Sequence, residues 1–234
     1  MTARCDELAL AGPEHLDAGF VAGYDRKSGF DPTDDLRVLR DHGIGPASTV
    51  VDLGAGTGAF ALAAAAAFGR VVAVDVSPAM VGTTRGRVRA AEVTNVEVVQ
   101  AGFLSYEHAG TAADAVYTRN ALHHLPDIWK AIALDRIARL LRPGGVLLVR
   151  DLVYDCSPSE FDSVVAHWLD GAVDDPEQGY TRAELAEHVR TEHSTFRWLF
   201  EPMLTTAGFE ILDVGFRRRV YASYTCVRGQ SRKS

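Results

Sequence analysis

A glycine-rich segment at residues 51–58 constrains the fold of this chain more than any other feature. Its sequence is Val-Asp-Leu-Gly-Ala-Gly-Thr-Gly, and it overlaps the end of an apolar stretch at 49–53 and precedes an alanine-rich stretch at 59–68. Glycine has no Cβ, so the backbone can turn tightly there and a ligand can approach it closely. The pattern predicts a strand, a tight turn and a helix that together bind a nucleotide-type cofactor.

Apolar, strand-like stretches then alternate with helical patterns as far as residue 151. We predict strands over 49–53, 70–76, 96–100, 114–118 and 146–151, and helices over 59–68, 78–91 and 128–141. Strands separated by helices of this length indicate βαβ units and a parallel sheet with right-handed connections. Two further strands, at 209–214 and 220–227, are joined by a short link and are expected to form an antiparallel hairpin at the sheet edge. The chain is therefore predicted to be a doubly wound α/β protein.

Two segments lie outside this alternation. Residues 1–48 form an N-terminal extension in which we predict a helix at 33–41. Residues 152–207 show no clear strand, and three helices are predicted there, over 159–169, 181–193 and 195–206. Long insertions of this kind are usually functional, so we expect 152–207 to form a helical cap over the site. The core domain then spans 49–228, and 229–234 is a tail.

Composition and charge limit the partners of the protein. The net charge of −7 disfavours a nucleic-acid substrate, because nucleic-acid binding needs a basic surface. The longest apolar run, at 59–68, is about ten residues, well below the roughly 20 that cross a bilayer, so no membrane partner is expected. The first ten residues carry charges and lack the apolar core of a signal peptide. Three widely spaced cysteines predict neither a disulfide framework nor a metal site, and they indicate a cytoplasmic protein.

Two classes of cofactor fit the glycine turn. Asp75 follows Gly54 by 21 residues and ends the second predicted strand, where a carboxylate can accept hydrogen bonds from both ribose hydroxyls. Gly54, Gly56 and Ala59 also match a dinucleotide pattern, in which a pyrophosphate lies at the helix N-terminus. Asp52 favours S-adenosylmethionine over a dinucleotide. A buried acid repels a pyrophosphate but can lie beside the ammonium of S-adenosylmethionine.

Three motifs resemble those of the class I S-adenosylmethionine-dependent methyltransferases: Asp52–Gly58, Val74–Met80 and Leu140–Gly145. The resemblance extends from about residue 49 to 228. It implies a seven-stranded, mostly parallel sheet with strand order 3-2-1-4-5-7-6 and S-adenosylmethionine as cofactor. The resemblance and the turn together give the following expected cofactor-binding residues: Tyr24, Asp52, Gly54, Ala55, Gly56, Gly58, Asp75, Val76, Met80, Gly102, Phe103 and Asn120.

The resemblance assigns parts of the cofactor to these residues. The glycine turn is expected to line the methionine moiety, and Val76 and Met80 to flank the adenine. Tyr24 belongs to a segment that relatives use as a flap, and it is expected to close on the cofactor carboxylate. Gly102 departs from the family pattern, because relatives commonly have there an acid that binds the adenine amino group. The backbone of Phe103 is the substitute that we consider.

The methyl acceptor is expected beyond the fourth and fifth predicted strands, because ligands of such sheets bind outside the carboxyl ends. Family resemblance places Asn120 beside the methionine end of the cofactor. His123 and His124 follow it, and a histidine can take a proton from an acceptor hydroxyl or amine near neutral pH. Packing or capping of the next helix is the alternative role for these two histidines.

Four further residues are candidates for the substrate pocket. Arg150 and Asp151 end the fifth predicted strand, and they either bind a charged group of the substrate or form a structural ion pair. Trp168 and Trp198 belong to apolar helical patterns within 152–207 and are expected to supply apolar walls.

The sequence therefore predicts methyl transfer from S-adenosylmethionine to an oxygen or nitrogen atom of a small molecule. Positioning the acceptor and excluding water carry much of such a reaction, so no single catalytic residue is obligatory. A nicotinamide-dependent oxidoreductase and a non-catalytic S-adenosylmethionine-binding protein are the alternatives. No metal is expected, and the oligomeric state is not predicted.

Overall fold

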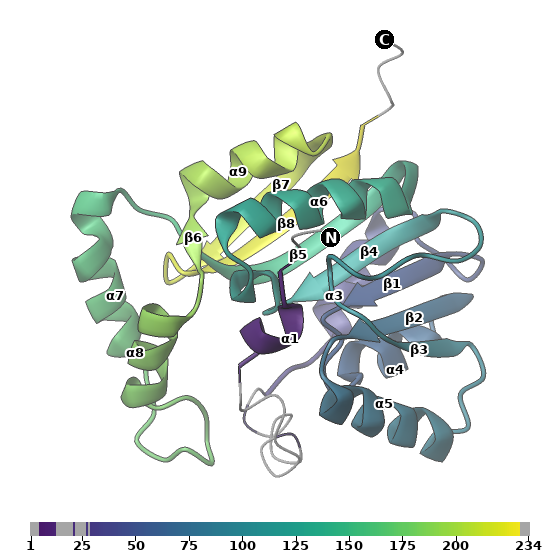
Figure 1. Ribbon diagram of the computed structural model, residues 1–234, viewed down its shortest axis with the longest axis horizontal. Helices are drawn as coiled ribbons and strands as arrows, with labels where there is room; N and C mark the ends of the chain where they lie inside the picture. The colour runs from purple at the N-terminus through teal and green to yellow at the C-terminus, as the bar shows by residue number, and fades with distance from the viewer. Residues whose placement is uncertain (1–4, 13–20, 22–26, 28, 230–234) are drawn as a thin grey trace.

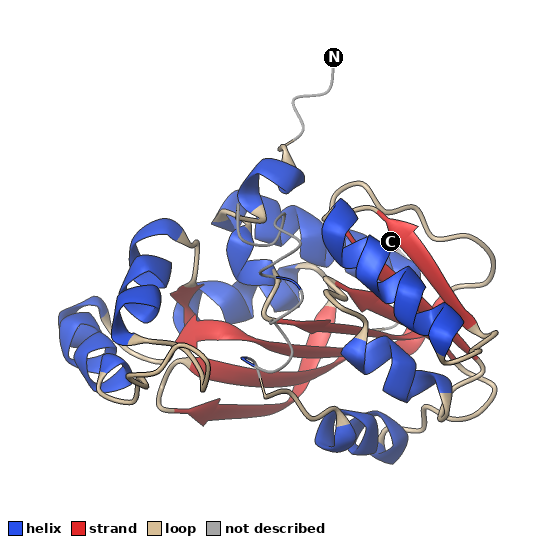
Figure 2. Cartoon of the chain, turned by 90° about the horizontal axis from the view of Figure 1, so that it is seen from below, coloured by secondary structure: helices blue, strands red, loops and turns tan. Residues whose placement is uncertain are grey.

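The computed structural model describes residues 5–12, 21, 27 and 29–229. Its centre is a mostly parallel sheet with helices on both faces (Figures 1 and 2). The strands are β1 (Thr49–Leu53), β2 (Arg70–Asp75), β3 (Val96–Gln100), β4 (Ala113–Arg119), β5 (Leu141–Tyr154), β6 (Thr195–Phe196), β7 (Phe209–Arg217) and β8 (Tyr221–Arg228).

The order of the strands confirms the predicted fold class. The sheet runs β3-β2-β1-β4-β5-β8-β7, and the two-residue β6 pairs with β5 outside this path. Without β6 this is the expected order 3-2-1-4-5-7-6. The pairs among β1 to β5 are parallel, whereas β8 is antiparallel to both β5 and β7. The closing hairpin therefore lies at the sheet edge, as predicted.

Helices cover the two faces of the sheet. The helical elements are α1 (Glu7–Leu10), α3 (Thr33–Asp41), α4 (Ala59–Ala65), α5 (Pro78–Ala90), η2 (Leu122–His124), α6 (Asp127–Leu140), η3 (Pro158–Glu160), α7 (Phe161–Leu169), α8 (Arg182–Thr191) and α9 (Arg197–Thr206). Residues of α3 and α4 share one buried cluster with the sheet, and residues of α6 and α9 share another. Helix α5 packs against β2 and β3.

The alternation of side chains along β1 explains these two layers. Val50 belongs to the cluster beneath α3 and α4, whereas Val51 and Leu53 belong to the cluster beneath α6 and α9. Successive side chains of a strand point to opposite faces, so a strand covered on both sides has to be apolar throughout. The turn into α5 follows from the sequence as well: the Ser77 hydroxyl accepts a hydrogen bond from the Met80 amide, and Pro78 occupies the first helical position.

Residues 152–207 differ from the sequence prediction in two respects. The expectation of no strand there was wrong, because β5 continues to Tyr154 and β6 pairs with its end. In addition, α9 packs on the sheet beside α6 and β7, so it is a layer helix. Helices α7 and α8 instead project beyond the end of β5, at the left of Figure 1. They form a separate buried cluster with Leu152, Tyr154 and Val220.

The turn between β7 and β8 is shorter than the predicted link. It comprises residues 218–220, and Arg218 and Arg219 have φ angles of 55° and 58°. Consecutive left-handed residues give a turn whose twist matches that of a hairpin. Among the residues that the structure describes, no helix has the length and hydrophobicity needed to span a bilayer.

Candidate active site

Three cavities lie at the carboxyl edge of the sheet. The glycine-loop cavity, about 540 Å³, is lined by residues 54–57 at the turn after β1. The Glu7 cavity is lined by Glu7 of α1 together with Asp75 at the end of β2. The histidine cavity, about 330 Å³, is lined by η2 and α8 and includes His123 and His188. The cavities are adjacent, because they share lining residues.

Asn120 lines all three cavities. It follows β4 directly, its φ of 48° lies in the left-handed region, and its amide donates to the carbonyl of Arg150 at 2.8 Å. Asparagine tolerates this conformation better than most residues. Asn120 therefore lies where the three cavities adjoin, and it marks the junction of the site.

The glycine turn has the geometry that the sequence predicted. Gly54 and Gly58 have φ angles of 76° and 81°. A Cβ on Gly54 would lie 2.4 Å from the Cβ of Ala121, and one on Gly58 would lie 2.6 Å from Thr84 Cγ2. Both positions therefore require glycine. At Gly56, by contrast, a Cβ would meet no atom within 4 Å, so the turn is open on the side of the cavities.

Asp75 links the glycine turn to the start of α5. Its Oδ2 accepts a hydrogen bond from the Gly56 amide and its Oδ1 one from the Ser77 amide, each at 2.8 Å. Burial raises the pKa of Asp75, and these two amides counteract the rise. A carboxylate has about four acceptor positions, so Asp75 can still accept hydrogen bonds from a ribose.

Asp52 is a buried carboxylate without a full set of partners. Its side chain lines the glycine-loop cavity and the residue is 1% exposed. Its Oδ2 has no hydrogen-bond partner among the described residues. Burial, and then the negative charge of Asp75, raise the pKa of Asp52 well above its usual range. An unpaired buried carboxylate is costly, and a cation in the cavity would relieve that cost.

The residues expected around an adenine also come together. Val76, Met80, Gly102 and Phe103 all line the Glu7 cavity, as do Ala11 and Leu125. Tyr24, expected to be a flap residue, lies outside the described residues. Glu7 was not predicted, although it faces the same cavity as the expected residues.

Asp151 fixes the position of His123. One carboxylate oxygen lies 2.5 Å from His123 Nδ1, and the other accepts the Leu122 amide at 2.8 Å. Burial raises the pKa of Asp151, but the charge and hydrogen bond of His123, with the backbone amides, outweigh it and lower the pKa. Asp151 is therefore engaged inside the protein, and its partner is His123 rather than Arg150.

Arg150 belongs to a different buried network. Its Nε donates to Asp35 Oδ1 of α3 at 2.6 Å, and the Tyr117 hydroxyl donates to Asp35 Oδ2 at 2.7 Å. Arg119 lies 3.5 Å from the same carboxylate. These contacts hold α3 against β4 and β5. Arg150 still lines the glycine-loop cavity.

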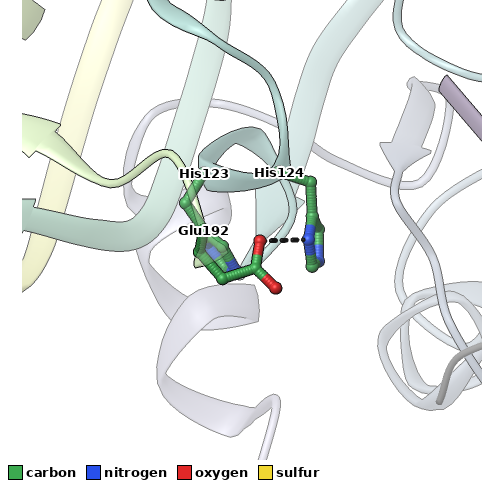
Figure 3. Close-up of side chains that lie close together, drawn as sticks. All are labelled: His123, His124 and Glu192. Atoms are coloured by element: carbon green, nitrogen blue, oxygen red, sulfur yellow. Dashed lines mark hydrogen bonds and ion pairs between the residues drawn. The ribbon is translucent and has the colours of Figure 1, made fainter. Parts of the chain in front are cut away.

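His124 pairs with a carboxylate that the sequence did not reveal (Figure 3). Its Nδ1 lies 2.8 Å from Oε2 of Glu192, at the end of α8. Burial raises the pKa of Glu192, but the hydrogen bond from His124 and the nearby histidines outweigh it and lower the pKa to about 2. His124 lines both the Glu7 cavity and the histidine cavity, so it stands between two ligand sites.

Contacts next to Glu192 hold this end of α8 in place. The His193 amide donates to the carbonyl of His123 at 2.9 Å. The buried ammonium of Lys130 donates to the carbonyl of His193 and, at 3.0 Å, to Asp127 Oδ1. His188 lies one turn earlier, and burial, together with the charge of His123, lowers its pKa to about 3, so its ring is neutral.

The donor atoms of His123, His124 and Glu192 lie within 4.8 Å of one another, a spacing that a metal ion could exploit. Both imidazoles are, however, already hydrogen-bonded to carboxylates, His123 to Asp151 and His124 to Glu192. We therefore interpret the cluster as two imidazole–carboxylate pairs.

The two tryptophans have different positions. Trp168 is buried, lines the histidine cavity, and donates its indole N–H to the Tyr221 hydroxyl at 3.0 Å. Trp198 lies on α9, is 52% exposed, and stacks on Phe196. It lines none of the three cavities defined above by the described residues. The expectation that Trp198 is a pocket wall therefore has no support from these three cavities, and its helix covers the sheet.

The chain is a doubly wound α/β domain with three adjacent cavities, and comparison with known proteins shows what it is similar to. Residues 50–145 match the profile of a family described as Methyltransferase domain. Phosphoethanolamine N-methyltransferase 2 of Caenorhabditis elegans is 28% identical over 132 residues, which cover 56% of this chain and 29% of that protein. The 27-O-demethylrifamycin SV methyltransferase of Amycolatopsis mediterranei is 30% identical over 116 residues, which cover 49% and 42%.

A solved structure shares the fold over nearly the whole chain. Phosphoethanolamine N-methyltransferase 2 of Haemonchus contortus, in complex with phosphomonomethylethanolamine and S-adenosylhomocysteine, superposes with a TM-score of 0.71 at 17% identity. The match covers 98% of this chain and 62% of that one. Residues 50–145 are therefore similar to a methyltransferase domain, and the strand order is that of the class I methyltransferase fold that the motifs predicted. The chain spans less than half of the two curated relatives.

Proposed function

We propose that the protein transfers the methyl group of S-adenosylmethionine to an oxygen or nitrogen atom of a small molecule. The observation that carries the proposal is the junction at Asn120, where the two cavities suited to the cofactor meet a third cavity bordered by histidines. A donor and an acceptor placed on the two sides of this junction would face each other across Asn120.

The residues present fit the cofactor. Asp52, whose carboxylate oxygen has no partner among the described residues, would bind the ammonium of the methionine moiety. Asp75 would bind the ribose, and the Glu7 cavity, with the apolar side chains of Val76 and Met80, would take the adenine. The bound cofactor supplies an electrophilic methyl group on a sulfonium.

The His124–Glu192 pair is suited to accept a proton from the methyl acceptor. When Nδ1 carries the proton that points to Glu192, Nε2 carries the lone pair of the neutral ring and can act as a base. A carboxylate that holds the imidazole also stabilises its charged form. His123 is 6% exposed and paired with Asp151, so its role is to fix the position of the loop after β4. His124 is the histidine that would accept the proton.

Helices α7 and α8 would form the cap of the acceptor site. This cap is shorter than the segment 152–207, which the sequence predicts to form it. Trp168 of α7 and Leu185 of α8 are apolar walls of the histidine cavity. The N-terminal extension reaches the same cap, because Lys27 forms an ion pair with Glu184 of α8. Closure of these two segments over the junction would exclude water from the sulfonium.

The substrate is proposed to be a free small molecule, because the histidine cavity is about 330 Å³ and lies at the lower end of the size of drug-like ligand sites. A cytoplasmic location is supported by Cys5, Cys156 and Cys226, which are all free thiols.

Incubation with S-adenosylmethionine labelled in its methyl group tests the proposal. With a deproteinised cell extract as the source of acceptors, we expect label in a low-molecular-weight product, and we expect the variant Glu192→Gln to make that product more slowly. Label transferred to protein or nucleic acid alone, in an undepleted extract, would contradict a small-molecule acceptor. Binding of a reduced nicotinamide, with no binding of S-adenosylhomocysteine, would instead support an oxidoreductase.

A further inference from the structure

The Glu7 cavity contains a carboxylate from outside the sheet. Glu7 lies in the first turn of α1 and is 9% exposed. Its Oε1 accepts the amide of Leu104 at 2.9 Å, and its Oε2 accepts the hydroxyl of Ser105 at 3.1 Å. The N-terminal helix is thereby attached to the loop after β3, nearly a hundred residues further along the chain.

Gly102 makes room for this carboxylate. A Cβ on Gly102 would lie 2.4 Å from Glu7 Cδ and 2.4–2.5 Å from the two carboxylate oxygens. No real Cβ makes contacts this short, and Gly102 has no positive φ that would otherwise demand glycine. A side chain at position 102 would therefore displace the Glu7 carboxylate from the position that it occupies here.

The carboxylate of Glu7 retains capacity for a ligand. Leu104 and Ser105 use two of its roughly four acceptor positions, and the Phe103 amide also donates toward it. The cavity that it lines is also bordered by the apolar side chains of Met80, Phe103 and Leu125. An apolar slot with a carboxylate in its wall matches a flat heteroaromatic ring that carries an amino group, because carboxylates accept hydrogen bonds and cannot donate them when charged.

We infer that Glu7 binds the exocyclic amino group of the cofactor's adenine, and that α1 is consequently part of the cofactor site. This inference rests on S-adenosylmethionine being the cofactor. The geometry also explains why Gly102 can stand where relatives commonly have an acid. In this chain the acid is Glu7, which belongs to a segment that precedes the core domain. Burial raises the pKa of Glu7, and the Leu104 amide and the Ser105 hydroxyl counteract that rise, as an amino donor would.

Calorimetric titration with two ligands tests the inference. S-Adenosylhomocysteine has the amino group, whereas S-inosylhomocysteine has a carbonyl oxygen in its place and would face the carboxylate with a second acceptor. We expect the wild-type protein to prefer the adenosyl ligand by about 10-fold or more. We expect Glu7→Ala to remove this preference. The ratio of the two affinities is measured in one sample, so a partly unfolded variant does not distort it.

A variant that restores a carboxylate in this cavity provides a second test. In the double variant E7A/G102D the new carboxylate occupies the space that Glu7 has left, so the preference should return. Leu8→Ala changes an exposed side chain of the same helix and should leave the preference intact. An unchanged preference in E7A would overturn the inference, whereas failure of the wild-type protein to bind S-adenosylhomocysteine at all would overturn the proposed cofactor instead.

Discussion

Replacing Asp52 with asparagine should stabilise the ligand-free protein and weaken cofactor binding. Asp52 is buried, its Oδ2 lacks a partner among the described residues, and burial raises its pKa. A carboxyl group whose folded pKa lies above its unfolded value destabilises the folded state as pH rises through the folded pKa. Asparagine is neutral, so it removes that cost at neutral and alkaline pH.

The magnitudes follow from the environment of the carboxylate. One pKa unit between the folded and unfolded states corresponds to about 1.4 kcal/mol, and asparagine cannot ionise, so Asp52→Asn should raise the free energy of unfolding by about this amount or more at a pH above the folded pKa of Asp52. The lost contact to the cofactor ammonium should weaken binding by about 1.5–3 kcal/mol, or about 10- to 150-fold in Kd. One substitution therefore moves stability and affinity in opposite directions.

Urea unfolding of the ligand-free protein and calorimetric titration with S-adenosylhomocysteine measure the two effects. Thr118→Val is the matched control: Thr118 is fully buried in β4, and within the described part of the chain its hydroxyl also has no partner. It lines none of the three cavities, so the control should gain stability and keep its affinity. If Asp52→Asn lost stability and kept full affinity, Asp52 would be a structural residue and the assignment of the ammonium site would fail.

Three further predictions concern the histidines. His124→Gln should lower kcat and abolish the acid limb of the pH profile of kcat. Glu192→Gln should lower kcat less and shift that limb to lower pH, because the imidazolium of His124 loses its carboxylate partner. Unchanged pH profiles in both variants would exclude a base at this position. Prolonged treatment with EDTA should leave initial rates unchanged, because we interpret the cluster of His123, His124 and Glu192 as part of two imidazole–carboxylate pairs and not as a metal site. A loss of activity that zinc restores would instead show a metal site. Because the pKa of His188 is lowered to about 3, the free energy of unfolding should fall as pH decreases from about 6.5 toward 3, by up to about 1.4 kcal/mol per pH unit from this group. His188→Gln should flatten that slope in pH-dependent urea unfolding and the exposed His167→Gln should not; equal slopes in both variants would refute the assignment.

The fold was predictable because its information is local. Each βα unit carries its own apolar strand, turn and amphipathic helix, so the alternation in the sequence predicts the layers, and the glycine turn with Asp75 identifies the binding edge. The short β6 was missed because two residues form a strand only through their pairing with β5. For Trp198, helical spacing predicts an apolar face but does not say whether that face packs on the sheet or lines a pocket.

The site was predictable only in part, because only its local elements leave a pattern in the sequence. The expected cofactor residues of the core domain follow strand ends, and strand ends converge at one edge. Glu192 and Glu7 reach the site through tertiary contacts that span 68 and 97 residues, and no motif marks either of them. For Glu7 the sequence did contain an indirect signal: Gly102 stands where relatives commonly have an acid.

A crystal structure of the protein with S-adenosylhomocysteine would show whether the three cavities form one methyl-transfer site. We expect adenine beside Glu7, ribose hydroxyls on Asp75, the amino group at Asp52, and the sulfur at Asn120 facing the histidine cavity. A ligand bound elsewhere, or one whose sulfur faces away from His124 and the histidine cavity, would contradict the proposed methyl transfer at this junction.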